Sequence, residues 1–259
     1  MLKIVCIGAG RLAHQLMPEL ERAGCEVIEV YNRTPDAGQY LVRSLKAATY
    51  QGDISKITTG GDIYFFAISD DGIGPLAKQV SDLANDHSIF VHCSGILSLN
   101  VLPFKRRGIF YPLQTFSATH TVDWLNTPIL ITTDNDDVLN QLNSLAHQIS
   151  DKVYDVPGRD KAIIHLAAVF ANNFSNHMLT LAEEICLDHH LSFEILKPLI
   201  RETFEKALTA GPSQSQTGPA IRGDEKTIKK HLTLLADQME LKALYQAITK
   251  SIKEHRKPE

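Results

Sequence analysis

Several residue types that mark special classes of protein are scarce in this chain of 259 residues. It has four cysteines, one tryptophan and no run of 18 consecutive apolar residues. The cysteines are Cys6, Cys25, Cys93 and Cys186, and they form no C-x-x-C pair. We therefore expect free thiols in a cytoplasmic protein, with no disulfide framework. The apolar run Ile4–Ile7 is too short for a signal peptide, and we expect no membrane association.

Positive charge is not in excess either. Lysine and arginine number 26, against 30 aspartates and glutamates, which leaves a net charge of −4. A chain without basic excess lacks the charge that neutralises a phosphate backbone, so we expect no nucleic-acid partner. Hydrophobic residues make up 44% and charged residues 22%, which is ordinary for a folded chain and excludes whole-chain disorder or a coiled coil.

Short apolar runs alternate with helix-like stretches over the first two-thirds of the chain. Runs that are apolar on both faces are typical of a parallel sheet covered by helices on both sides. We expect strands at Leu2–Ile7, Glu26–Tyr31, Ile63–Ile68, Ile89–His92, Gly108–Tyr111, Ile129–Thr132 and Lys152–Val156. The pattern predicts an α/β fold of the Rossmann type, with a mainly parallel sheet and helices on both faces.

The strand patterns stop after residue 157, where Pro-Gly interrupts the chain. A long helical pattern follows over Asp160–Leu187, and Asp224 is a good N-cap for the final helix. We therefore predict a sheet domain of residues 1–157 and an all-α domain of residues 158–259.

A glycine motif connects the first expected strand to the first helix. The segment Gly-Ala-Gly-Arg-Leu-Ala from Gly8 to Ala13 fits G-x-G-x-x-A. In that pattern Gly8 permits a tight turn and Gly10 lets the backbone approach a pyrophosphate. The helix that starts at Arg11 and Leu12 offers free N–H groups to phosphate. The position of the motif between a strand and a helix favours a dinucleotide site, and the alternative is a glycine-rich turn without a ligand.

The end of the second expected strand bears on the choice of cofactor. An NAD site usually has an aspartate or glutamate there, which binds the ribose 2′-hydroxyl. This chain has Asn32, Arg33 and Thr34 instead, and Glu29 comes too early. Because Arg33 can bind a 2′-phosphate through two hydrogen bonds, the sequence favours NADP over NAD. The alternative is a solvated arginine in a turn.

Three further residues follow strand ends and complete the expected cofactor site. The carboxyl ends of parallel strands face the ligand crevice. Ile68 and Ser69 follow one strand and Ser94 follows the next, so we expect them to line the path to the nicotinamide. The histidines show no spacing with a carboxylate that suits a metal, and we expect no metal site.

The helix after Asp160 carries the candidate catalytic residues. At about 100° per residue, Lys161, His165, Asn172 and Asn176 share one narrow stripe. Lys161 or His165 would donate a proton to a carbonyl or imine, and Asn172 would orient the substrate. The alternative is an ordinary polar helix face, and Tyr111 and Arg222 are then the next candidates.

The same motifs resemble those of a bacterial family of NADP oxidoreductases in which a Rossmann-like domain precedes a helical domain of unknown function. The segments that carry the resemblance are Gly8–Ala13, Asn32–Thr34, His92–Gly95, Tyr111–Phe116, Lys161–Asn173 and Thr217–Asp224. The wider superfamily contains pyrroline-5-carboxylate reductase and 6-phosphogluconate dehydrogenase. The resemblance implies a helical dimerisation domain and an active site between domains. The 3-hydroxyacid dehydrogenases of that superfamily have asparagine four residues after a catalytic lysine. Here His165 follows Lys161, so their mechanism does not transfer.

These observations predict an NADP-dependent oxidoreductase that transfers hydride between NADP(H) and a small carbonyl or imine substrate. The alternatives are a dinucleotide-binding regulator without turnover and a deazaflavin-dependent NADP reductase. We also expect a homodimer formed through residues 160–259, as the resemblance implies.

Overall fold

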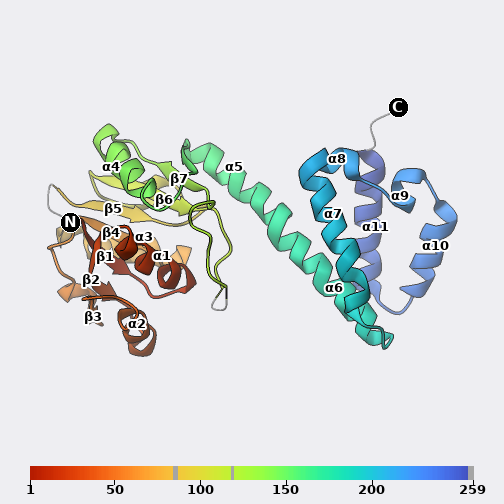
Figure 1. Ribbon diagram of the computed structural model, residues 1–259, viewed down its shortest axis with the longest axis horizontal. Coiled ribbons are helices and arrows are strands. Elements are labelled where there is room, and N and C mark those ends of the chain that lie inside the picture. Colours follow the sequence, from red (N-terminus) through yellow and green to blue (C-terminus); the bar gives the residue numbers. More distant parts are fainter. Residues whose placement is uncertain (84–86, 118–119, 256–259) are drawn as a thin grey trace. The chain divides into compact units, whose positions relative to one another are not determined.

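The computed structural model describes residues 1–83, 87–117 and 120–255. The chain divides into two compact units, Met1–Ser175 and Asn176–Glu259 (Figure 1). The strands end before Gly158, where the first helix of the all-helical part begins, and that helix belongs to the first unit. The division into domains of residues 1–157 and 158–259 stays a prediction.

The first unit contains a Rossmann-type sheet, as the sequence predicts. Within the described residues the sheet has eight strands in the order β3-β2-β1-β4-β5-β6-β7-β8. The strands are β1 (Lys3–Ile7), β2 (Glu26–Tyr31), β3 (Thr49–Gln51), β4 (Ile63–Phe66), β5 (Ile89–His92), β6 (Arg107–Pro112), β7 (Ile129–Thr132) and β8 (Val153–Asp155). Neighbouring strands are parallel, except that β6 and β7 are antiparallel. The sequence analysis missed β3, because this edge strand has three residues and no buried apolar run.

Helices cover both faces of this sheet. Alternate residues of β1 point to opposite sides, so Ile4 and Cys6 belong to one apolar core and Val5 and Ile7 to the other. The helices of this unit are α1 (Arg11–Arg22), α2 (Pro35–Val42), α3 (Asp70–Gln79), α4 (Asp136–Ala146) and α5 (Gly158–Ala168). Helices α1, α2 and α4 contribute to the core of Ile4, and α3 contributes to the core of Val5. Loops follow the carboxyl ends of the central strands, and the candidate site lies among these loops.

Helix α5 continues into a turn of π-helix, η4 (Val169–Phe174), and then into α6 (Ser175–Asp188). The sequence analysis treated this stretch as one regular α-helix. A π-helical turn has wider hydrogen-bonded rings and shifts the angular position of every later residue. The angular positions predicted for Asn172 and Asn176, which assume a regular α-helix, therefore no longer follow from the sequence.

The second unit is helical throughout the described residues. After α6 it contains η5 (Phe193–Leu196), α7 (Lys197–Ala210), α8 (Pro212–Ser215), α9 (Pro219–Arg222), α10 (Glu225–Leu234) and α11 (Met239–Glu254). The Asp224 side chain accepts a hydrogen bond from the N–H of Thr227 at 3.0 Å, which confirms the predicted N-cap. The helix that it caps is not the final one, since α11 follows. No helix of the described chain combines the length and apolarity needed to cross a membrane.

Candidate functional site

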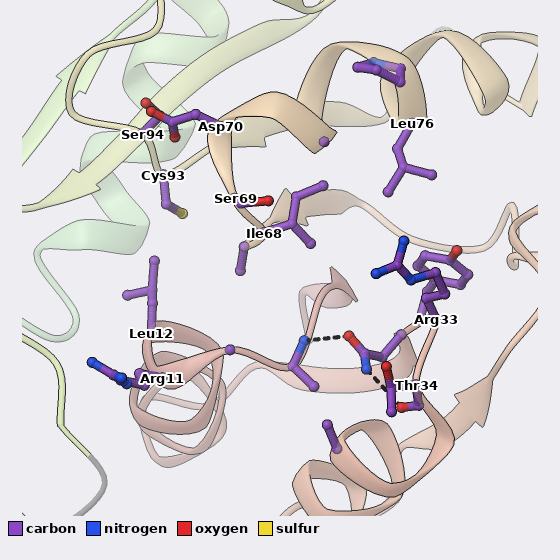
Figure 2. A pocket seen from close by; sticks show the side chains of 18 residues that line it. Arg11, Leu12, Arg33, Thr34, Ile68, Ser69, Asp70, Leu76, Cys93 and Ser94 are labelled. Carbon is purple, nitrogen blue, oxygen red and sulfur yellow. Dashed lines mark hydrogen bonds between the residues drawn. The ribbon is translucent and has the colours of Figure 1, made fainter.

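A cleft of about 620 Å³ lies where the loops after β1, β2, β4 and β5 converge. Nine of the ten residues predicted to bind the cofactor line it (Figure 2): Gly10, Arg11, Leu12, Asn32, Arg33, Thr34, Ile68, Ser69 and Ser94. Gly8 does not line it. Because the strands are parallel, residues far apart in the sequence meet at one edge of the sheet.

The two glycines of the motif have different roles in this loop. Gly8 has φ +117°, and a Cβ there would lie 2.5 Å from the carbonyl oxygen of Ala67. A Cβ at Gly10 would meet only that oxygen, at 3.7 Å. Gly8 therefore shapes the turn against β4, and Gly10 leaves the backbone open to the cleft. The N-cap residue of α1 is Gly10, and within the part of the chain that the structure describes no side chain caps this helix. Its first N–H groups are therefore available to an anion.

Asn32 holds the neighbouring loops together. Its Oδ1 accepts a hydrogen bond from the N–H of Ala9 at 3.2 Å, and its Nδ2 donates to the carbonyl of Thr34 at 2.8 Å (dashed lines in Figure 2). Both ends of the amide are thus engaged with the protein. Asn32 ties the glycine loop to the end of β2, and one N–H of its amide and one lone pair of its Oδ1 remain for a ligand.

The end of β2 presents a cation and no carboxylate to the cleft. Arg33 is exposed, and among the described residues its guanidinium has no hydrogen-bond or ion-pair partner. Glu29 is buried and accepts a hydrogen bond from the N–H of Thr58 at 2.8 Å, while burial raises its pKa. The carboxylate of Glu29 therefore points into the protein, as the early position of this residue in the strand suggests.

Lys161 has an environment that its sequence position did not predict. Its side chain is 0% exposed. Its ammonium donates to the carbonyls of Ser94 at 2.9 Å, Gly95 at 2.7 Å and Leu97 at 2.9 Å. We call this arrangement the lysine clamp. The expectation that Lys161 faces a crevice is wrong, because all three of its protons are directed at the loop after β5.

Burial lowers the pKa of Lys161 to about 8, and the carboxylate of Asp70 acts in the opposite direction. Lys161 is therefore still mostly charged at neutral pH. Only the charged form has three protons for three carbonyls. The clamp is accordingly complete at neutral pH.

Ser94 and His92 complete the internal bonding of this loop. The Ser94 Oγ accepts hydrogen bonds from the N–H groups of Ile96 and Leu97 at 3.2 and 3.0 Å. The N–H of Ser94 donates to Nδ1 of His92 at 3.2 Å. Burial, followed by the charge of Lys161, lowers the pKa of His92 to about 4. His92 is therefore neutral, and Nδ1 can act as an acceptor.

A second cavity of about 520 Å³ lies beside the first, and Arg11 lines both. The hydroxyl of Tyr111 lies 3.0 Å from Nδ1 of His165, and both side chains line this cavity. Burial, with a smaller effect of Asp70, raises the pKa of Tyr111, so its hydroxyl stays protonated at neutral pH. A Cβ at Gly95 would overlap Nδ1 of His165. The loop held by Lys161 thus contacts the Tyr111–His165 pair directly.

The π-helical turn decides which later residues reach this cavity. Asn172 and Asn173 line it, whereas Asn176 lines a different cavity with residues of the second unit. The predicted association of His165 with Asn172 is thus present, and that with Asn176 is absent. From the sequence, Tyr111 is a candidate only if Lys161 and His165 are not catalytic. Its position just after the apolar part of β6 was the signal that places it at the sheet edge.

Neither a reactive thiol nor a metal cluster is found among the described residues of this region. Burial raises the pKa of Cys93 to about 12, which keeps it an unreactive thiol. Within the described residues, no three histidines, cysteines or acidic residues lie close enough to hold a metal.

A doubly wound sheet, a glycine turn at β1 and an uncapped helix start beside an arginine together define a Rossmann-type dinucleotide-binding protein. Comparisons with known proteins agree. Residues 127–252 match a domain of unknown function, DUF2520, and residues 1–90 match the shikimate / quinate 5-dehydrogenase family. The structure of "putative NADP oxidoreductase BF3122" from Bacteroides fragilis shares 35% identity, covers 98% of each chain and has a TM-score of 0.92. The chain belongs to the family of this protein.

More distant structures share the fold. The protein TM1727 from Thermotoga maritima is 22% identical over 97% of each chain, with a TM-score of 0.73. The imine reductase from Myxococcus stipitatus, solved with NADP+, is 14% identical over 97% of this chain and 93% of its own, with a TM-score of 0.67. A search of the curated proteins finds no match.

Proposed function

We propose that this protein is an NADP-dependent oxidoreductase that transfers hydride between NADP(H) and a small carbonyl or imine compound. One observation carries the proposal. A dinucleotide-type cleft and a cavity with a tyrosine–histidine pair adjoin each other, and Arg11 lines both. The name of the Bacteroides fragilis relative and the NADP+ bound to the imine reductase support the same class of reaction.

The residues of the cleft fit the parts of NADP. The free N–H groups at the start of α1 would bind the pyrophosphate above Gly10. Arg33 and Thr34 would bind the 2′-phosphate at the end of β2. Ser94 would lie toward the nicotinamide, on the loop that the lysine clamp holds. When bound as NADPH, the cofactor supplies the hydride and is released as NADP+.

The Tyr111–His165 pair would supply the proton that completes the reduction. Tyr111 keeps its proton at neutral pH because its pKa is raised, and His165 accepts or donates through Nδ1. The proton would pass from the tyrosine hydroxyl to the substrate oxygen or nitrogen, and His165 would return a proton to the tyrosine. Asn172 would orient the substrate from the π-helical turn. Lys161 has no place in this transfer, because its protons are bound to backbone carbonyls.

Titration of the protein with NADPH and NADH tests the cofactor assignment. Arg33→Met should weaken NADPH binding about ten- to a hundredfold, since a charged pair with the 2′-phosphate contributes ~1.5–3 kcal/mol. NADH binding should stay unchanged. Arg43→Met is the matched control, because Arg43 is exposed and outside the residues that line the cleft. Equal NADPH affinity in the Arg33→Met variant and the wild type would refute the role of Arg33.

Turnover separates the proposed enzyme from the two alternatives. Oxidation of NADPH with 2-oxo acids, aldehydes or cyclic imines supports the reductase. Tight NADPH binding without turnover of any of these favours a regulator. Turnover that requires an oxidised deazaflavin favours the deazaflavin-dependent reductase.

We also propose a homodimer formed through residues 160–259. Large apolar side chains are exposed throughout this segment: Ile163, Leu166, Phe170, Phe174, Leu187, Leu191, Ile195, Leu199, Leu208, Leu234 and Met239. Exposed apolar surface on this scale favours association with another copy. Light scattering at micromolar concentration should give twice the chain mass, and a monomer would contradict the proposal.

We propose a cytoplasmic location, because Cys6, Cys25, Cys93 and Cys186 are all free.

A further inference from the structure

The charge of the second cavity bears on the class of substrate. Arg11 is the one arginine or lysine among the described residues that line it, and no aspartate or glutamate is among them. Within the described chain the Arg11 side chain has no hydrogen-bond or ion-pair partner. An arginine that lines a cavity without a carboxylate is available to an anion from outside.

The neutral groups around Arg11 also favour an anion. The Oε1 of Gln114 accepts a hydrogen bond from the N–H of Thr115 at 2.8 Å, and among the described residues the NH2 group of this amide has no hydrogen-bond partner. Asn172 and Asn173 offer further amide groups. The cavity is thus rich in donors that suit carboxylate oxygens.

Charged groups that do not line the second cavity leave its preference for an anion in place. The ammonium of Lys161 lies 5.9 Å from the centre of the Tyr111 ring, on the buried side of the pair. The carboxylate of Asp70 lines the first cavity, and after burial it contributes to the raised pKa of Tyr111. Arg11 and Lys161 therefore place positive charge near the Tyr111–His165 pair, while Asp70 contributes negative charge from the first cavity.

The arrangement of these groups limits where the anion and the reducible bond would lie. Arg11 is shared by both cavities, and in Figure 2 it lies on the opposite side of the first cleft from Arg33. Arg33 is therefore the cation for the 2′-phosphate end. Arg11 lies where a substrate would meet the cofactor, beside the proton-transfer pair.

We infer that the substrate is a small carboxylate that carries its own reducible C=O or C=N bond, such as a 2-oxo acid or a cyclic imino acid. Its carboxylate binds Arg11 and the amides, and its C=O or C=N group faces Tyr111. In the reduction, the substrate carbon gains hydride from NADPH, which becomes NADP+, and the oxygen or nitrogen gains the proton of the Tyr111 hydroxyl. This inference rests on the proposed function and names its substrate class.

Matched pairs of compounds test the inference. The pairs are 2-oxobutanoate with 2-butanone, and 1-pyrroline-2-carboxylate with 1-pyrroline. We expect the wild type to reduce the carboxylate of at least one pair with kcat/KM at least tenfold above its neutral partner. Arg11→Met should remove that advantage by lowering kcat/KM for the carboxylate ten- to a hundredfold. The matched control Arg43→Met should retain it.

If the protein turns over none of these compounds, the binding of a substrate analogue still tests the inference. Oxalate resembles a 2-oxo acid and cannot accept hydride. Calorimetry should show that it binds the NADP+-loaded wild type and not the NADP+-loaded Arg11→Met variant. Preference for neutral compounds, no binding of oxalate at millimolar concentration, or a carboxylate preference that survives Arg11→Met would each overturn the inference. The proposed function would survive these results. It would fail if the protein bound no NADPH, which the same titration measures first, or if it bound NADPH and turned over neither the carboxylates nor their neutral partners.

Discussion

Replacing Lys161 by methionine separates its structural role from the catalytic role that its position in the helix suggests. Methionine keeps most of the apolar stem and removes the three donated hydrogen bonds. In the clamp, the carbonyls of Ser94 and Gly95 accept buried bonds, whereas the bond to Leu97 is only partly buried. Water can replace the donor at Leu97, so two acceptors lose their partners.

The size of the effect follows from these contacts. An unsatisfied buried acceptor costs about 1–3 kcal/mol, so two cost about 2–6 kcal/mol. Removing a buried charge recovers part of this cost, and the lowered pKa of Lys161 shows that burial does oppose its charge. We expect a net loss of about 2–4 kcal/mol in the free energy of unfolding. For a chain of this size that corresponds to a drop in Tm of roughly 5 to 15 °C.

The assay combines thermal unfolding with NADPH titration. Lys161→Met should lower both Tm and NADPH affinity, because Ser94 lies on the clamped loop and lines the cleft. Lys152→Met is the control, since Lys152 is exposed in the same unit and its replacement should change stability by less than about 0.5 kcal/mol. If Lys161→Met has the wild-type Tm and NADPH affinity but loses turnover, the clamp is refuted. Lys161 then acts in the chemistry after all.

Three further predictions follow from the same contacts. Tyr111→Phe should lower kcat by about 10²- to 10⁴-fold with NADPH affinity intact. The control Tyr154→Phe, at an exposed position, should leave kcat unchanged. Equal kcat in both variants would exclude Tyr111 as the proton donor. The pKa of Lys161 is lowered from 10.5 to about 8 in the folded chain, so the unfolded chain binds more protons in that window, and the free energy of unfolding should rise by up to about 1.4 kcal/mol per pH unit from pH 8 to 10.5. The same dependence in Lys161→Met would contradict this. The pKa of His92 is lowered from 6.5 to about 4 in the folded chain. Between pH 4 and 6.5 the unfolded chain therefore binds more protons than the folded chain. The free energy of unfolding should fall by up to about 1.4 kcal/mol per pH unit on acidification from pH 6.5 to 4. His92→Asn should flatten this dependence, and chemical denaturation at several pH values measures it.

The sequence by itself determined the sheet and the cofactor edge. Buried strands such as Ile63–Phe66 are apolar on both faces, and that local pattern suffices to predict a covered parallel sheet. The topology of such a sheet brings the ends of its strands together. Gly10, Arg33 and Ser94 could therefore be assigned to one cleft without coordinates.

The catalytic edge was only partly predictable, for a geometric reason. Angular positions on a helix follow from the sequence only while the helix stays regular, and the π-helical turn at Val169–Phe174 moved Asn176 away from the cavity that Asn172 lines. Helical periodicity also does not predict which residues of other segments contact a given side chain. Lys161 and His165 lie one turn apart on the same helix. Only the tertiary structure decided that the first meets three carbonyls of a distant loop and the second meets Tyr111, because such contacts depend on how the loop after β5 packs against α5.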